Sequence, residues 1–333
     1  CRHVDEILEV KGVGRPPLRI TSNHKMLMAR SRHRGKGYFH DPDWVSIDDS
    51  WVETYLYGTC STFHSRIQDT PFIDLASYHP SYYSGNMIRK GPHKILVDKD
   101  FLMLVGYYLA EGSIGGGKFD AAIQLSSHKK EKNIRAWAMH YLTLLGLSPK
   151  ERFGKGNEAV IICPHVPLAK FFRTFGVRED KSLPKWMEIL PPDKQKWILI
   201  GYMLGDGSFT DGRITSNTIS PHIAFQIWDI FLRLGLPASL VKDRTPGEYL
   251  IHERKGFTKQ RWKLKTTVPV ANAIKEFVPP DLLFDKGNKD LDCQDQSCIK
   301  KRDDYYIGQI YKVSKVRYSG LVYNLHVEED NSY

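Results

Sequence analysis

The chain has 333 residues, of which 41 % are hydrophobic, and its 48 Lys and Arg against 38 Asp and Glu give a net charge of +10. This length and apolar content suit about two globular domains, and the basic balance favours a polyanionic partner, nucleic acid before membrane. The longest apolar run, residues 101–110, is far shorter than the ~18 residues that span a bilayer, and the five cysteines are scattered. We therefore expect no membrane segment, no signal peptide and no disulfide framework, and a reducing, cytoplasmic location.

Residues 1–95 are rich in Pro, Gly, Tyr, Ser and basic residues and lack a helical period. Short runs at 4–10, 18–21 and 25–29 are separated by turn residues, as in a strand-rich region. The sequence therefore predicts an irregular β region here.

The segment 104–112, Leu-Val-Gly-Tyr-Tyr-Leu-Ala-Glu-Gly, predicts the end of an apolar helix. Gly106 and Ala110 are four residues apart and share one helix face, which leaves a smooth strip for close contact with another helix. Gly112 suits the left-handed conformation that ends many helices. Glu111 would then lie at the carboxyl tip of the helix.

The residues around this segment predict an α+β unit over 96–190. Asp98 is placed to cap the first helix. The elements expected after it are a strand at 121–127, a helix at 130–145, a strand at 159–163 and a helix at 168–175.

A second copy of the nonapeptide occupies 199–207, Leu-Ile-Gly-Tyr-Met-Leu-Gly-Asp-Gly. Gly201 and Gly205 repeat the smooth strip, Asp206 repeats the carboxylate, and Gly207 repeats the stop. Two helices with such strips can approach each other at the backbone.

The elements after the second copy repeat the earlier order, and the two acids lie 95 residues apart. The repeated elements are a strand at 213–216, a helix at 224–234, a strand at 261–265 and a helix that ends at 277. An internal repeat of this size indicates a duplication, with halves at 96–190 and 191–284. The charged stretch 285–304 has no apolar period and is expected to be a linker.

The pair Glu111 and Asp206 predicts a metal site. An anion at the carboxyl end of a helix is disfavoured by about 0.3–1 kcal/mol, and two adjacent carboxylates repel each other. A divalent cation would reverse both effects, and Mg²⁺ prefers carboxylate and carbonyl oxygens. The alternative, two surface acids that follow two amphipathic helices, does not explain why both copies match.

Both nonapeptides resemble the LAGLIDADG motif of homing endonucleases, with Glu111 in place of the usual Asp. The resemblance implies a monomeric, site-specific DNA endonuclease with two pseudo-twofold αββαββα halves. It implies that Glu111 and Asp206, with the carbonyls of Ala110 and Gly205, hold two or three Mg²⁺ or Mn²⁺ ions that assist phosphodiester hydrolysis.

The resemblance also implies one catalytic lysine in each half. Lys181, in Lys-Ser-Leu-Pro, matches the Lys-x-Ile-Pro element that precedes the second motif, and Lys265 matches the other site. The counterpart of Lys265 in the first half would be Cys163, so we expect the two halves to differ chemically.

Double-stranded DNA is the expected partner, with phosphates contacted by Lys and Arg and bases by strand side chains. Because a strand exposes every second residue on one face, we expect one group of DNA-binding residues in each half. They are Gln124, Ser126, His128, Lys129 and Lys130 in the first half, and Arg213, Thr215 and Lys263 in the second. A slip of one residue would exchange the faces.

The two ends of the chain resemble parts of an intein splicing domain. Thr21-Ser-Asn-His24 resembles its Thr-x-x-His element, and 321–333 resembles its penultimate strand segment. The resemblance implies a partial, mostly β Hint-like domain. Its parts would be residues 1–95, with a possible DNA-contacting insertion, and residues 305–333. Cys1 is out of register for a splicing nucleophile and the terminal His-Asn pair is missing, so we expect no splicing.

Three functions remain open from the sequence. The first is a homing endonuclease carried within an intein, which both acids favour. The second is a catalytically silent DNA-binding or RNA-maturase protein on the same scaffold. The third is an active splicing intein whose ends are missing here.

Overall fold

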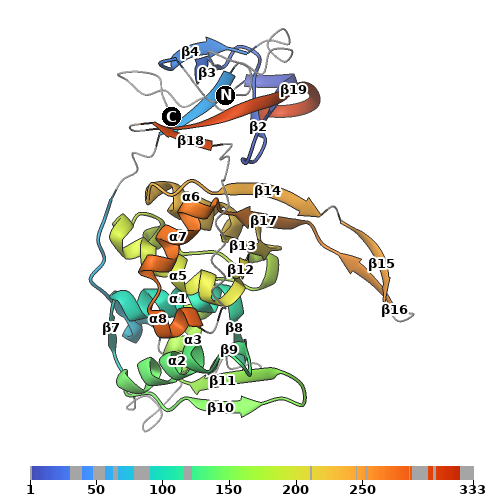
Figure 1. Ribbon diagram of the computed structural model, residues 1–333. Helices are drawn as coiled ribbons and strands as arrows, with labels where there is room; N and C mark the ends of the chain where they lie inside the picture. Colours follow the sequence, from blue (N-terminus) through green and yellow to red (C-terminus); the bar gives the residue numbers. More distant parts are fainter. Residues whose placement is uncertain are drawn as a thin grey trace. The chain divides into compact units, whose positions relative to one another are not determined.

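The computed structural model describes residues 2–30, 40–47, 57–62, 67–78, 91–115, 122–210, 212–244, 246–251, 254–284, 286, 299–302 and 305–322 (Figure 1). The chain divides into two compact units. Residues 1–63 and 297–333 form one, here called the β unit, and residues 64–296 form the other, here called the αβ unit. None of the helices in the described ranges has both the length and the apolar character to cross a membrane.

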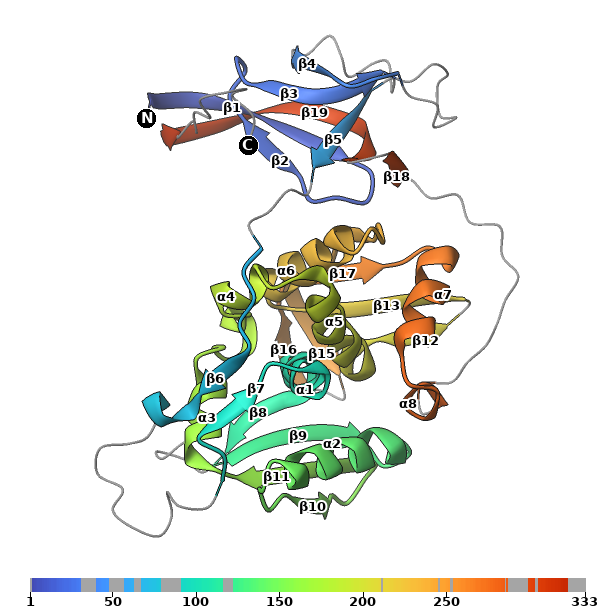
Figure 2. The same cartoon turned by 90° about the vertical axis from the view of Figure 1, so that its left-hand side faces the viewer.

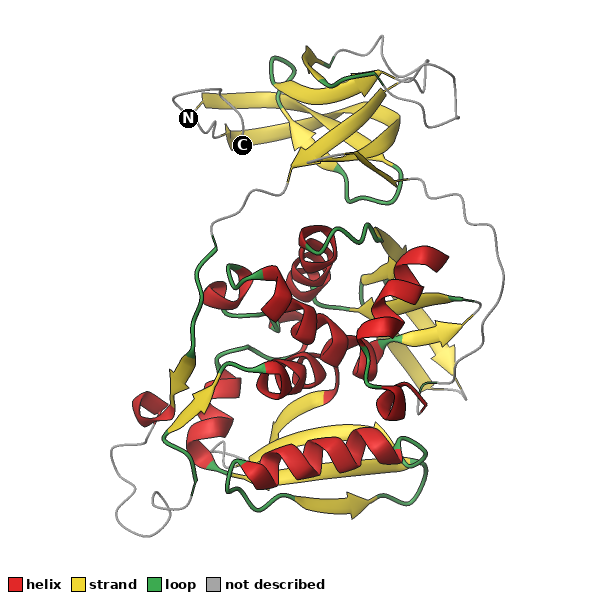
Figure 3. Ribbon diagram, turned by 60° about the vertical axis from the view of Figure 1, so that its left-hand side comes forward, coloured by secondary structure: helices red, strands yellow, loops and turns green. Residues whose placement is uncertain are grey.

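The β unit is an antiparallel sheet in the order β2-β1-β19-β5-β3-β4, with β18 beside β19. Its strands are β1 (Arg2–Gly12), β2 (Leu18–Ile20), β3 (Lys25–Arg30), β4 (Asp43–Ser46), β5 (Tyr57–Thr62), β18 (Ile299–Arg302) and β19 (Tyr305–Val322). Strand β1 buries Leu8 and Val10 and leaves Glu9 between them more exposed, as its alternation requires. Within the described residues, all helices lie in the αβ unit (Figure 3).

The αβ unit contains two halves with one order of elements, αββαββα. The first half is α1 (Lys99–Glu111), β8 (Gly112–Gly115), β9 (Ala122–His128), α2 (Lys132–Leu144), β10 (Lys150–Phe153), β11 (Glu158–Pro164) and α3 (Val166–Arg173). The second half is α5 (Pro192–Asp206), β12 (Ser208–Thr210), β13 (Arg213–Thr218), α6 (Pro221–Arg233), β14 (Ser239–Arg244), β17 (Arg261–Lys265) and α7 (Val268–Phe277). Their sheets run β8-β9-β11-β10 and β12-β13-β17-β14, so the halves share one topology.

Shorter elements complete the αβ unit. They are β6 (Phe72–Asp74), the 3₁₀ helix η2 (Leu75–Tyr78), β7 (Lys94–Leu96), the 3₁₀ turn η5 (Arg178–Asp180), α4 (Lys185–Glu188), β15 (Gly247–Ile251), β16 (Arg254–Thr258) and α8 (Pro280–Phe284). Strands β15 and β16 form a ribbon that continues outward from β14 and β17 (Figure 1).

The segment before α1 differs from the expected boundary at residue 95. Strands β6 and β7 pair with each other, and residues 64–95 group with the αβ unit. Leu75 and Ile95 explain this, because both are fully buried in the core of that unit. The sequence predicted an irregular β region over 1–95 but carried no signal for which core each strand joins.

Helices α1 and α5 are in backbone contact at their small residues. They pack against each other between the two sheets of the αβ unit (Figure 2). A Cβ atom on Gly106 would lie 2.0 Å from the carbonyl oxygen of Ile198, and one on Gly201 would lie 2.0 Å from that of Met103. This confirms the close-packed strips predicted from the nonapeptides.

The glycines that follow the acids are not left-handed, so that prediction was wrong. Gly112 has φ −84° and Gly207 has φ −76°, and both are extended. A Cβ atom at Gly112 would lie 2.5 Å from the carbonyl oxygen of Tyr108, and one at Gly207 would lie 2.2 Å from that of Met203. After α1 and after α5, the main chain turns into the next strand so close to the last turn of the helix that only glycine fits.

Candidate functional site

The two predicted acids end the two packed helices. Glu111 is the last residue of α1 and Asp206 is the last residue of α5. Burial and, to a smaller extent, the nearby charge of Glu111 together raise the pKa of Asp206 to about 7. Burial likewise raises the pKa of Glu111 above its ordinary value. The structure thus brings the carboxylates within electrostatic reach of each other, where a cation would stabilise both ionised forms.

Lys181 lies at the carboxyl end of α1. Its side chain is buried, and its Nζ donates to the carbonyl oxygens of Tyr108 at 2.5 Å and Gly112 at 2.8 Å. The ammonium also lies 4.6 Å from the centroid of the Tyr108 ring. Burial lowers the pKa of Lys181 to about 8, while the charges of Asp206 and Glu111 oppose this shift. The predicted lysine is therefore beside the predicted acids.

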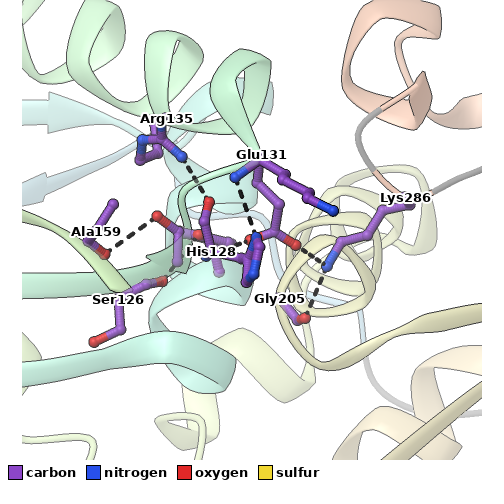
Figure 4. Close-up of polar contacts among 10 residues, drawn as sticks. Ser126, His128, Glu131, Arg135, Ala159, Gly205 and Lys286 are labelled. Carbon is purple, nitrogen blue, oxygen red and sulfur yellow. Dashed lines mark hydrogen bonds and ion pairs between the residues drawn. The ribbon is translucent and has the colours of Figure 1, made fainter. Parts of the chain in front are cut away.

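Lys286 occupies the matching place at the end of α5 (Figure 4). Its Nζ lies 3.1 Å from the carbonyl oxygen of Gly205 and 2.8 Å from Oε1 of Glu131. Its charge lowers the pKa of both Glu111 and Asp206. The sequence analysis placed this residue in the 285–304 linker and missed it.

A sequence signal for Lys286 exists in the repeat. An Asp-Lys pair follows the third helix of each half, at 180–181 and at 285–286. The second pair lacks the Leu-Pro that made the first recognisable, and it lies in a polar stretch without period. A comparison of the halves beyond their last helices would have found it.

Each of these lysines is held in place by the opposite half. The carbonyl of Lys181 accepts a hydrogen bond from Ser220 Oγ at 2.6 Å, at the start of α6. Helix α8, directly before Lys286, contacts α2, where Asn133 Nδ2 donates to the carbonyl of Asp281 at 2.8 Å. In each half, the segment after the third helix therefore packs against the other half. This packing brings both lysines back to the ends of the paired helices α1 and α5.

Lys265, which the resemblance gave as the second catalytic lysine, does not lie among the groups at the helix ends. It is exposed on the outward face of β17, opposite Thr215 and Ser239. The lysines whose charges act on the two acids are Lys181 and Lys286.

The predicted equivalence of Lys265 and Cys163 is wrong by one residue. Cys163 is fully buried and pairs with Ile123. In the second half it is Thr266 that bonds to the corresponding strand residue, Ile214, through its main-chain N–H at 3.0 Å. Since successive strand residues face opposite sides, Lys265 and Cys163 point to different faces.

An open cleft of about 420 Å³ adjoins Glu111. It is lined by Glu111, Ser126, Ser127, His128, Glu131, Asn157 and Glu158. Glu131 Oε2 accepts from the main-chain N–H of His128 at 2.9 Å, and Arg135 Nη1 donates to the His128 carbonyl at 2.6 Å (Figure 4). These bonds fix the end of β9 beside the acid, so the cleft wall is formed by a bonded network.

The outward faces of the strands follow the predicted alternation. In β9, Gln124, Ser126 and His128 are partly exposed, while Ile123 and Leu125 are buried. Three of the side chains predicted to bind DNA in the first half are therefore accessible on the outward face of β9. Lys130 beyond it is exposed, and Lys129 Nζ donates to the carbonyl of Gly154 at 3.0 Å.

The second half repeats this pattern. Arg213 and Thr215 are partly exposed on β13, whereas Ile214 and Ser216 are buried. Lys263 lies on the same outward face of its sheet and is 3.9 Å from Asp243.

The donor set at the helix ends suits a hard divalent cation. It consists of two carboxylates and the carbonyls of Ala110 and Gly205, which directly precede them, and these are oxygen ligands of the kind that Mg²⁺ takes. In the part of the chain that the structure describes, no group of three or more His, Cys, Asp and Glu side chains is arranged to hold a metal. A metal here would depend on main-chain carbonyls in addition to Glu111 and Asp206.

The intein-like tetrapeptide lies in the β unit. Thr21 and His24 form a turn between β2 and β3, in which the main-chain N–H of His24 donates to the Thr21 carbonyl at 3.0 Å. Burial lowers the pKa of His24. Of the intein-like segment 321–333, residues 321 and 322 end β19, and the remainder lies outside the described residues.

No family model matches the chain. It is 28 % identical over 81 % of its length to uncharacterized protein MJ0043 of Methanocaldococcus jannaschii, and 26 % identical over 89 % to uncharacterized protein MJ1054 of the same organism. The chain spans 33 % and 35 % of the lengths of these two proteins, about a third of each.

Among solved structures, the chain is similar to I-DmoI in complex with DNA and Ca. Identity is 10 %, coverage is 56 % of this chain and 97 % of that one, and the TM-score is 0.43. It is also similar to the N-terminal LAGLIDADG domain of DUF199/WhiA, with 12 % identity, coverage of 58 % and 84 %, and a TM-score of 0.34. The assignment of two αββαββα halves rests on the strand order and helix pairing of the chain itself.

Proposed function

We propose that the αβ unit is a LAGLIDADG-type endonuclease that cuts both strands of a specific DNA site with the help of divalent metal ions. One observation carries the proposal: Glu111 and Asp206 meet at the tips of two helices in backbone contact, with Lys181 and Lys286 beside them. Two buried acids with raised pKa values beside a buried lysine with a lowered pKa, Lys181, are typical of a catalytic site.

Glu111 and Asp206 would hold two or three Mg²⁺ or Mn²⁺ ions, with the carbonyls of Ala110 and Gly205 as further ligands. Such ions, when bound, stabilise the attacking and leaving oxygens of phosphodiester hydrolysis. The protein contributes position: the α1–α5 backbone contact sets how near the two carboxylates lie, because the two helices are already as close as their main chains allow.

Lys181 is suited to proton transfer. Its pKa of about 8 lets it exchange a proton near neutral pH, and its two carbonyl partners fix the Nζ atom. Lys286 replaces Lys265 as the second lysine of the proposal, because it and not Lys265 acts on the acids. Lys265, on the outward face with Thr215, becomes a DNA phosphate contact.

Double-stranded DNA would lie along the outward faces of the two sheets. Gln124, Ser126 and His128 in the first half and Arg213 and Thr215 in the second would read bases. Lys129, Lys130 and Lys263 would contact phosphates. Because both halves are in one chain, the proposed enzyme acts as a monomer. Its carriage within an intein rests on the Thr21–His24 element and the tail sequence alone.

The test combines cleavage with binding. The full chain is incubated with a library of DNA sites in Mg²⁺ or in EDTA, and cut ends are sequenced to identify the target. We expect cleavage only with Mg²⁺. Glu111→Gln and Asp206→Asn should each lower the rate at least 100-fold and keep site-specific binding in Ca²⁺, because each removes a ligand and leaves the fold intact.

The matched control is Glu276→Gln, an exposed acid on α7, which should cut at the wild-type rate. Near wild-type cleavage by either site variant would overturn the metal assignment. Specific binding by the wild type without any cleavage would instead favour the catalytically silent DNA-binding or RNA-maturase function.

A further inference from the structure

A lysine ammonium lies at one of the carbonyls proposed to bind metal. Lys286 Nζ is 3.1 Å from the carbonyl oxygen of Gly205, the residue directly before Asp206. Its side chain is only 9 % exposed. A positive charge therefore already lies at the negative end of α5, where a divalent cation would bind.

The ammonium is held from the other half of the molecule. Glu131 at the start of α2 pairs with it at 2.8 Å and is itself 18 % exposed (Figure 4). The second oxygen of Glu131 accepts from the main-chain N–H of His128, whose carbonyl accepts from Arg135 Nη1. The ion pair is thus built on a fixed carboxylate and is more than a chance surface contact.

The two helix ends differ in this respect. Lys181 donates to the carbonyls of Tyr108 and Gly112, and neither of these is a proposed ligand. Lys286 donates to Gly205, which is one. Among the described residues, no ammonium bonds to the carbonyl of Ala110, the proposed ligand at the α1 end, whereas Lys286 bonds to that of Gly205 at the α5 end.

We propose that Lys286, held by Glu131, is a built-in cation that occupies the α5 end of the site in the metal-free protein and must be displaced by a divalent ion. The proposal rests on the proposed function for the kind of ion. It predicts two unequal binding steps, of which the weaker one is at Gly205 and Asp206.

The test measures Ca²⁺ binding to the full chain without DNA, by isothermal titration calorimetry. Lys286→Met removes the ammonium and should tighten the weaker step by about tenfold or more, because a unit charge within a few ångström of a divalent ion repels it strongly. Lys150→Met is the matched control, since it removes one exposed charge on β10 and should leave both steps unchanged.

A second variant guards against misfolding of the first. Glu131→Gln combined with Lys286→Met leaves no unpaired charge at the pair and should still tighten the weaker step, by less than Lys286→Met alone, because it also removes the negative charge of Glu131. Unchanged or weaker Ca²⁺ binding in the variant that folds would overturn the proposal, as would the absence of Ca²⁺ binding in all of them.

DNA cleavage by the wild type tests the proposed endonuclease function separately from the Ca²⁺ titrations. Mg²⁺-dependent cleavage by the wild type, together with equal Ca²⁺ affinity in Lys286→Met, would reject the built-in cation and keep the proposed function. A wild type that binds no Ca²⁺ and cuts no DNA would reject both.

Discussion

At the scale of single residues, the two acids occupy positions that folding alone would avoid. Glu111 and Asp206 end helices, where a negative charge is disfavoured, and burial raises the pKa of each. The structure compensates with two ammonium groups, those of Lys181 and Lys286, instead of removing the acids. Buried charged groups that lower the stability of the fold in this way are characteristic of functional sites.

Asp206 should make the metal-free protein less stable as pH rises. Its folded-state pKa of about 7 exceeds its ordinary value of 3.8, so between these pH values the folded state binds more protons than the unfolded state. The free energy of unfolding therefore falls from about pH 4 to pH 7 and stays lower above it. Asp206→Asn should remove this loss and raise stability at pH 8 by roughly 1–3 kcal/mol.

Urea unfolding in EDTA at pH 4.5 and pH 8, followed by tryptophan fluorescence, measures this difference. The gain should nearly vanish at pH 4.5. Asp193→Asn, an exposed acid at the other end of the same helix, should give no such gain. Equal effects of Asp206→Asn at both pH values would contradict the account.

At the scale of elements, the α1–α5 pair determines where the acids lie. Backbone contact at Gly106 and Gly201 sets the distance between the two helices. The extended residues Gly112 and Gly207 then turn the main chain from each helix into the sheet that follows it. The same two helices thus place both carboxylates and begin both sheets. A change in helix separation would alter the site before it altered the sheets.

Gly106→Ala should destabilise the αβ unit by about 2 kcal/mol or more. The added methyl group would lie 2.0 Å from the Ile198 carbonyl oxygen and 2.6 Å from the Tyr202 nitrogen, and main-chain atoms cannot move aside cheaply. Thermal unfolding followed by circular dichroism measures the loss. Gly156→Ala, where the new methyl group would meet nothing within 4 Å, is the control and should leave Tm nearly unchanged. Similar Tm values for both variants would argue against a close-packed interface.

At the scale of the whole molecule, two units have separate hydrophobic cores. One cluster, with Met28 and Val10, belongs to the β unit, and a much larger one, with Phe231 and Leu104, belongs to the αβ unit. A large core gives cooperative stability that a small one cannot match. The two units are therefore expected to unfold separately.

Calorimetry of the full chain should show two transitions, with the β unit unfolding first. Met28→Ala should lower only the first, and Phe231→Ala only the second, because each removes a fully buried side chain from one core. The expected loss is about 2–5 kcal/mol in each case. A single transition that both variants lower together would show that the units unfold as one.

The sequence by itself determined the features that depend on neighbours along the chain. Helical and strand periods located β9, β17 and the two motif helices to within a few residues, and Asp98 caps α1 by accepting from the Phe101 N–H at 2.9 Å as predicted. The i, i+4 spacing of small residues was enough to predict that α1 and α5 touch. Each of these follows from local geometry, which repeats with a fixed period.

Only the tertiary structure decided the features that depend on which distant segments meet. Lys286 has no periodic context, and it reaches Gly205 because α8 crosses onto α2 of the other half. The pairing of Cys163 with Ile123 depends on strand register, which one residue of slip reverses. The glycine after each acid is required by a close approach that cannot be told in sequence from a left-handed stop. Long-range packing selects among local conformations of similar energy, so these positions cannot be read from one segment at a time.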